Sequence, residues 1–111
     1  MKAAWLLREG EVLASLEVTE SRQERMVGLL DRDGIDGAIL IRPARSVHSV
    51  GMAFPIDVAF CTTDLLVLRT ICLKPGRMTR PCLRGGCVIE AESGAFDRWG
   101  LRPGDRLEIR E

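Results

Sequence analysis

The sequence lacks a net charge, a long apolar run and all but one histidine. Its 111 residues carry 16 Lys and Arg against 16 Asp and Glu, and His48 is the single histidine. We do not expect such a balanced chain to bind nucleic acid, since general binding of that kind needs a basic domain. No apolar run approaches the roughly 20 residues that a membrane helix needs, so membrane insertion is not expected either.

Common catalytic and targeting motifs are missing as well. The chain has no nucleophile motif, no glycine loop for phosphate and no metal-binding helix, and we predict no cofactor. The apolar run Ala3–Leu7 is shorter than a signal-peptide core of about 7–15 residues, so we expect a cytoplasmic protein. Without repeats or a linker, residues 1–111 are predicted to form a single domain.

The spacing of apolar residues predicts a mainly β protein. Leu107 and Ile109 alternate with charged residues, which is typical of a strand with one exposed face. We expect a small antiparallel β-sandwich or barrel. Its strands are predicted over residues 3–7, 12–18, 37–41, 47–51, 56–61, 65–73, 86–91 and 106–110.

Turn and cap residues predict the connections. Glu9-Gly10 suits a hairpin between the first two strands. Two short helices are predicted at about 21–30 and 94–99. The first opens on the capping-box spacing of Ser21 and Glu24, and the second has Ser93 as its possible cap and Gly100 as its exit. Residues 75–86, rich in Pro and Gly, are predicted to be a long basic loop.

Charge is distributed unevenly along the chain. Residues 1–36 have a balance of −3, residues 37–84 a balance of +5, and residues 85–111 a balance of −2. No acid lies between Asp64 and Glu90. The basic segment is expected either to pair with the acidic ends inside the fold or to meet an acidic protein or small anionic ligand. For the second case the contact is expected through the Arg-rich segment 69–84, with Arg77, Arg80 and Arg84 as the candidate residues.

The four cysteines do not have the spacing of a structural metal site. Zinc sites usually use two close pairs, and only Cys82 and Cys87 come near that spacing. Cys61 and Cys72 fall within predicted strands, where a free cysteine acts as a small apolar residue. Cys82 and Cys87 remain candidates for redox chemistry, because Arg80 and Arg84 would favour a thiolate.

Three residues are candidates for acid–base chemistry. His48 is either a packed or surface residue or a general acid or base near neutral pH. Asp57 lies in an apolar stretch and, if buried, must bond backbone amides or a partner charge. Glu90 is similar. The main hypothesis is therefore a non-catalytic binding domain, and the alternative is a small hydrolase-like enzyme in which His48, Asp57 and Glu90 share one cleft.

Several ordered segments resemble domain-of-unknown-function family 192, a group of small prokaryotic β-rich proteins. The resemblance covers the opening helix signature, the strand after it, the Pro-Leu-Asp-Ile motif and a two-part C-terminal signature. In this chain the corresponding segments are 19–32, 37–41, 54–60, 88–94 and 100–105.

The resemblance implies a β-rich sandwich or barrel with short helices, but it implies no reaction. Asp57, Glu90 and Asp105 match family positions. Asp105 follows a Pro-Gly turn, so we expect it to stabilise that turn. The family's Trp-Met-Lys-Asn stretch is replaced here by residues 48–51, so no role of that Trp or Lys carries over. Some members lie among pilus or secretion genes, which suggests a partner in such machinery.

Overall fold

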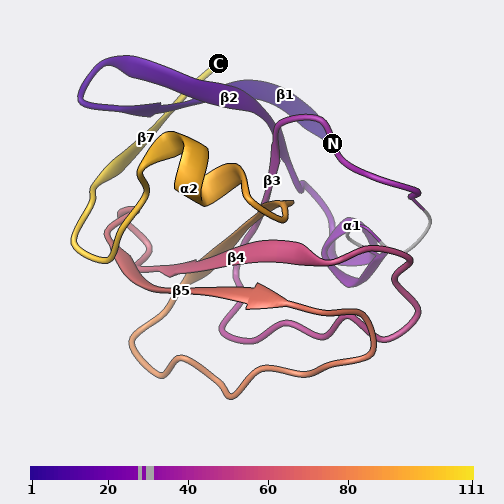
Figure 1. Ribbon diagram of the computed structural model, residues 1–111. Helices are drawn as coiled ribbons and strands as arrows, with labels where there is room; N and C mark the ends of the chain where they lie inside the picture. The colour runs from indigo at the N-terminus through magenta and orange to yellow at the C-terminus, as the bar shows by residue number, and fades with distance from the viewer. Residues whose placement is uncertain (28, 30–31) are drawn as a thin grey trace.

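Seven strands form one strongly curled sheet in the computed structural model, which describes residues 1–27, 29 and 32–111 (Figure 1). Along the sheet the strand order is β5-β4-β6-β3-β2-β1-β7. The elements are β1 (Lys2–Arg8), β2 (Glu11–Val18), α1 (Arg22–Val27), β3 (Ala38–Ile41), β4 (Ile56–Cys61), β5 (Val67–Leu73), β6 (Cys87–Glu92), α2 (Ala95–Trp99) and β7 (Leu107–Arg110).

The curl brings the two edge strands together at one end. Leu66, just before β5, forms an antiparallel bridge with Arg106, just before β7. Two backbone bonds flank it, from the Val67 amide to Asp105 and from the Leu107 amide to Leu65, at 2.8 and 2.9 Å. The sheet is thus a half-barrel closed at this end, which confirms the predicted mainly β, barrel-like architecture.

The hairpin predicted at Glu9-Gly10 is confirmed. Both residues have positive φ, 52° and 78°, as a two-residue turn matching the twist of the strands requires. All strand pairs are antiparallel except β2 with β3, which run parallel. The long connection through α1 returns the chain beside the last residues of β2, where Ala38 pairs with Leu16 and Leu40 with Val18. The antiparallel sheet that we predicted therefore contains one parallel pair.

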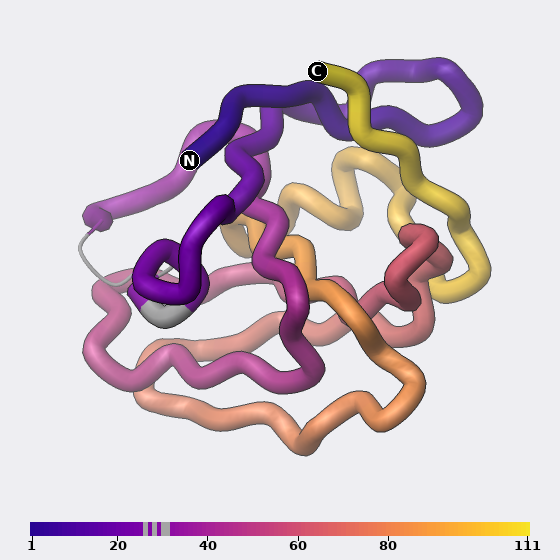
Figure 2. Tube along the Cα trace, turned by 180° about the vertical axis from the view of Figure 1, so that it is seen from behind, coloured from indigo at the N-terminus to yellow at the C-terminus, as the bar shows by residue number. Residues whose placement is uncertain are grey.

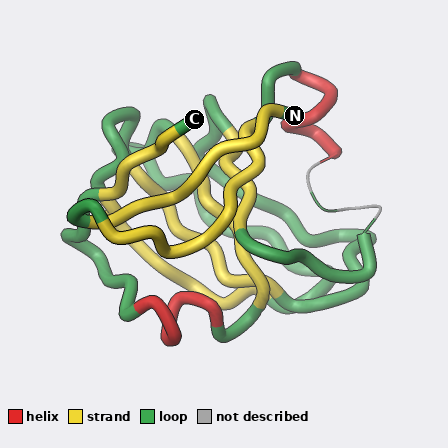
Figure 3. Tube along the Cα trace, turned by 90° about the horizontal axis from the view of Figure 1, so that it is seen from above, coloured by secondary structure: helices red, strands yellow, loops and turns green. Residues whose placement is uncertain are grey.

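The sheet is covered on both faces (Figure 3). On one side, α2 packs with β1, β2 and β7 over a cluster that includes Leu6, Ile89 and Phe96. On the other side, a second cluster includes Ile39, Val58 and Phe60. Because β4 and β6 lie between the two clusters, nearly all of their residues are buried, and the helices lie on different sides of the sheet.

The strand predicted over 47–51 is wrong. This segment is irregular and has one bridge, from His48 to Met78, in the loop predicted over 75–86. The Ser49 hydroxyl donates to the Lys74 carbonyl at 2.5 Å and accepts the Arg77 amide at 2.9 Å. Backbone bonds from the Ser49 amide to the Arg77 carbonyl and from the Thr79 amide to the Val47 carbonyl flank the bridge, and the bonds of the Ser49 side chain extend this short pairing. Figure 2 shows the two segments running beside each other along the outer edge of the molecule.

Both predicted helices form, and both are shorter than predicted. The Glu24 amide donates to the Ser21 hydroxyl at 3.1 Å, so Ser21 caps α1 as expected. The predicted extension of this helix to residue 30 falls partly on residues 28 and 30, which lie outside the described residues. Gly100 ends α2 with φ 63°, as predicted.

Gly37 controls the approach of β3 to β2. It has φ 79°, and a Cβ there would lie 2.4 Å from the backbone oxygen of Ser15. Gly10 has nearly the same φ, 78°, but open space around it.

We expect Gly37→Ala to lower the free energy of unfolding by more than about 2 kcal/mol, because the new side chain would have an unfavourable φ and would also clash with β2. Gly10→Ala should lower it by about 1–2 kcal/mol, since only the unfavourable φ applies there. Urea denaturation of both variants measures the difference, and equal losses would show that the contact with β2 is unimportant.

Candidate functional site

Asp57 caps helix α2 from a neighbouring strand. Its Oδ2 accepts the backbone amides of Gly94 and Phe96, both at 3.0 Å. Ser93 does not cap the helix as predicted, because the N-cap position is Gly94 and no side-chain bond is formed from it. A buried carboxylate on β4 thus satisfies amides that the helix leaves free. This matches the interpretation of Asp57 as a residue that holds down a loop.

Glu90 lies on the opposite face of the sheet from Asp57. It pairs in register with Val58 on β4 and with Ile39 on β3, and both neighbours are completely buried. Asp57 precedes Val58, so strand alternation directs it to the other side. Glu90 is 3% exposed, and no hydrogen bond reaches its carboxylate from the part of the chain that the structure describes.

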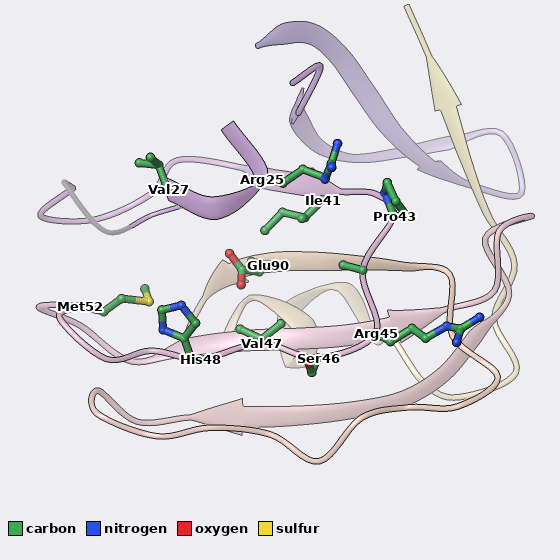
Figure 4. A pocket seen from close by; sticks show the side chains of 11 residues that line it. Arg25, Val27, Ile41, Pro43, Arg45, Ser46, Val47, His48, Met52 and Glu90 are labelled. Atoms are coloured by element: carbon green, nitrogen blue, oxygen red, sulfur yellow. The ribbon is translucent and has the colours of Figure 1, made fainter. Parts of the chain in front are cut away.

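A pocket of about 270 Å³ lies over Glu90. Figure 4 shows the Glu90 carboxylate at the centre of this pocket, between Ile41 and the ring of His48, with Met52 beside the ring. The pocket is lined by Arg25, Val27, Ile41, Pro43, Ala44, Arg45, Ser46, Val47, His48, Met52 and Glu90. Eight of these residues come from the segment 41–52, and the other three come from elsewhere in the chain. The sequence had singled out His48 and Glu90, but the apolar side chains beside them form no motif that could have indicated a pocket.

The predicted convergence of His48, Asp57 and Glu90 in one cleft is wrong in part. His48 and Glu90 share the pocket, whereas Asp57 borders a separate cavity beside Phe96. The cause is the period of the strand, which puts Asp57 and the residue opposite Glu90 on different faces. Ser46 is the one hydroxyl in the pocket lining, and Figure 4 shows it directed away from Glu90.

Burial changes the acidity of Glu90. Removal from water raises the pKa of its carboxyl from the ordinary 4.5 to about 7, because desolvation penalises the charged form. Near neutral pH the carboxyl of Glu90 is therefore divided between its neutral and its ionised form. Strong perturbation of this kind is typical of functional sites.

Cys61 and Cys72 lie within strands β4 and β5, as predicted. Cys87 lies directly opposite Cys61 across β4 and β6, and all four cysteines are free thiols. The hydrogen bond with Cys87, followed by burial, raises the pKa of Cys61 above its ordinary range. Cys82 is partly exposed and Cys87 is buried. Redox chemistry at Cys82 and Cys87 stays a prediction.

The basic segment does not pair with the acidic ends of the chain. Among the described residues, no ion pair involves Lys74, Arg77, Arg80 or Arg84, which are all exposed. The acids pair with cations elsewhere, in Lys2–Glu111, Arg8–Asp105, Arg32–Glu17, Arg98–Glu92 and Arg106–Asp64. Asp105 also accepts the Arg102 amide at 3.0 Å, which confirms its role in the turn.

Two large apolar side chains lie among these cations. Met78 is 75% exposed and Leu83 is 80% exposed. Together with Lys74, Arg77, Arg80 and Arg84 they form a surface that we name the 74–84 surface. The exposure of the two apolar residues had no signal in the sequence, because the loop prediction does not say which side chains point outward.

Other kinds of site are absent from the described part of the chain. Within it, no group of three or more His, Cys, Asp or Glu side chains could hold a metal ion. None of the helices described has the length and apolar character needed to cross a membrane.

Comparison with known proteins agrees with this fold. The profile of domain-of-unknown-function family 192, described as an uncharacterized ACR, matches residues 5–109. The chain belongs to this family. No curated protein matches the chain. Membership in family 192 confirms the resemblance found in the sequence.

Two solved structures share the fold of this family 192 protein. A protein from Sinorhizobium meliloti 1021, provisionally described as a transcription regulator, is 21% identical with a TM-score of 0.78, over 96% of this chain and 92% of that one. A protein of unknown function from Novosphingobium aromaticivorans is 17% identical with a TM-score of 0.76, over 96% of this chain and 83% of the other.

The cap formed by Asp57 can be tested by removing its carboxylate. We expect Asp57→Ala to lower the free energy of unfolding by roughly 1–3 kcal/mol, since two helix amides lose their acceptor. Asp97→Ala serves as the control, because Asp97 is an exposed acid of the same helix. Urea denaturation measures both. A loss no larger than that of the control would contradict the cap.

The burial of Glu90 predicts a pH-dependent stability. Between pH 4.5 and about 7 the folded protein keeps a proton that the unfolded chain releases, so stability falls as pH rises through this range. We expect wild type to lose roughly 3 kcal/mol relative to Glu90→Gln between pH 4.5 and pH 8, at about 1.4 kcal/mol per pKa unit. Urea denaturation at the two pH values tests this, and an unchanged difference between the proteins would contradict it.

Proposed function

We propose that this protein is a non-catalytic binding domain that docks an acidic, partly apolar protein segment on the 74–84 surface. The observation that carries the proposal is the exposure of four cations and two large apolar side chains on one loop. Arginine and methionine are enriched at protein interfaces. The absence of acids between Asp64 and Glu90 leaves the charge of this loop positive, which favours an acidic partner.

The backbone of this loop is held in place, although its side chains extend outward. Ser49 bonds residues 74 and 77, and the Cys82 amide donates to the Arg45 carbonyl at 2.7 Å. Arg69 stacks on the Phe60 ring at 4.5 Å and donates to the Arg80 carbonyl at 3.1 Å. A partner would therefore meet a surface that is already ordered, which lowers the entropy cost of binding.

The charge of the 74–84 surface can be tested with a peptide display library. Selection of random 12-residue peptides on the full protein is expected to enrich acidic peptides that also carry apolar residues. Their affinity should fall with added salt and should fall about tenfold or more in the variant Arg77→Ala/Arg80→Ala/Arg84→Ala, since exposed ion pairs contribute about 0.5–1 kcal/mol each.

The matched control removes three exposed arginines elsewhere, in Arg22→Ala/Arg102→Ala/Arg110→Ala, and should bind as wild type does. Enrichment of peptides without acidic residues would overturn the proposal, as would equal losses in both triple variants. Tighter, salt-sensitive binding of a short DNA duplex at the same arginines would favour nucleic acid instead and would also overturn it.

A further inference from the structure

The pocket over Glu90 holds a buried acid that forms no hydrogen bond or ion pair with any residue that the structure describes. Glu90 is 3% exposed, and its cross-strand neighbours Ile39 and Val58 are completely buried apolar residues. An ionised carboxylate in such surroundings is unfavourable unless it is paired. Asp57, the other buried carboxylate of this sheet, bonds two amides, whereas no described residue bonds Glu90.

The surroundings of Glu90 restrict what could pair with it. The charged or titratable side chains that line the pocket are Arg25, Arg45 and His48. Figure 4 shows the guanidinium groups of both arginines directed away from Glu90, and Arg45 Nε donates to the Gly85 carbonyl at 3.1 Å. One carboxylate and one imidazole also fall short of the ligand set of a metal ion.

Apart from these groups and Ser46, the side chains that line the pocket are apolar. Ile41, Val47 and Met52 surround the carboxylate together with the ring of His48 (Figure 4). A volume of about 270 Å³ suits a molecule of a few heavy atoms, near the lower end of ordinary ligand pockets. A single buried acid among the apolar side chains of Ile41, Val47 and Met52 favours a ligand with one cationic group on an apolar body.

We propose that this pocket binds a small organic amine, with its ammonium group against the Glu90 carboxylate and its apolar body along Ile41, Val47 and Met52. An anion would be repelled by the ionised acid, while an alcohol would gain no ion pair. This site is separate from the 74–84 surface and does not depend on the function proposed for that surface.

Binding of the amine is coupled to loss of a proton. Because burial raises the pKa of Glu90 to about 7, much of the free protein carries the neutral acid at pH 6. When the ammonium ion binds, the carboxylic acid gives its proton to the buffer and a carboxylate–ammonium pair forms. Charge and protons therefore balance with close to one proton released per amine bound, and affinity rises with pH up to the pKa of Glu90.

Calorimetric titration of the full protein tests this site, with n-butylammonium and n-hexylammonium as probes and 1-pentanol and butyrate as controls. Titration at pH 6 in two buffers of different ionisation enthalpy counts the protons released. We expect at least one of the ammonium ions to bind wild type with proton release. Glu90→Gln should bind it at least tenfold more weakly and without proton release.

Control variants separate this site from the rest of the molecule. Glu92→Gln removes an exposed acid of the same strand, and Arg77→Ala/Arg80→Ala/Arg84→Ala removes the cations of the 74–84 surface. Both should bind the amine as wild type does. Glu90→Leu, which removes the buried acid altogether, should stay folded and bind no amine.

The proposal is overturned if neither ammonium ion binds, or if Glu90→Gln binds the ion as tightly as wild type. It is also overturned if 1-pentanol or butyrate binds wild type as tightly as the ammonium ions do.

Discussion

The burial of β4 and β6 on both faces is the constraint on which the rest of this structure depends. A strand between two apolar clusters has no solvent side, so any polar side chain on it needs a partner within the molecule or a bound one. Asp57 has its partner in the amides of α2. Glu90, on the other face, opens into a pocket. One physical requirement thus explains why one acid is structural and the other is a candidate binding group.

The features of this fold that could be predicted from sequence are the local ones. The alternation of Leu107 and Ile109 and the turn at Glu9-Gly10 depend on neighbouring residues, and the structure confirms both. The parallel pairing of β2 with β3 depends on where a long connection returns. The irregular path of residues 47–51 depends on bonds from Ser49 to a segment about 25 residues later. Neither the parallel pairing nor the irregular path can be predicted from a local sequence pattern.

The candidate site was predictable in composition but not in arrangement. Glu90 and Asp57 stand out because they are acids in apolar stretches, and both are buried. Their separation onto two faces follows from the register of β4 against β6, which a single sequence does not reveal. The free cations near Arg77 and Arg80 were visible in the charge pattern, but the pairing of the acidic ends with other arginines was not. Long-range pairing decides which charges stay available.

The bridge between Leu66 and Arg106 also affects how this molecule meets other copies of itself. An open sheet exposes the amides and carbonyls of its edge strands, which can add a strand from another chain and begin aggregation. Here the backbone groups of the two edges hydrogen-bond to each other where the edges meet, through the bridge and the flanking bonds at Val67 and Leu107. Curling the sheet therefore protects the ends of β5 and β7 from edge-to-edge association, in addition to the charged side chains Arg69, Glu108 and Arg110 that these two strands carry.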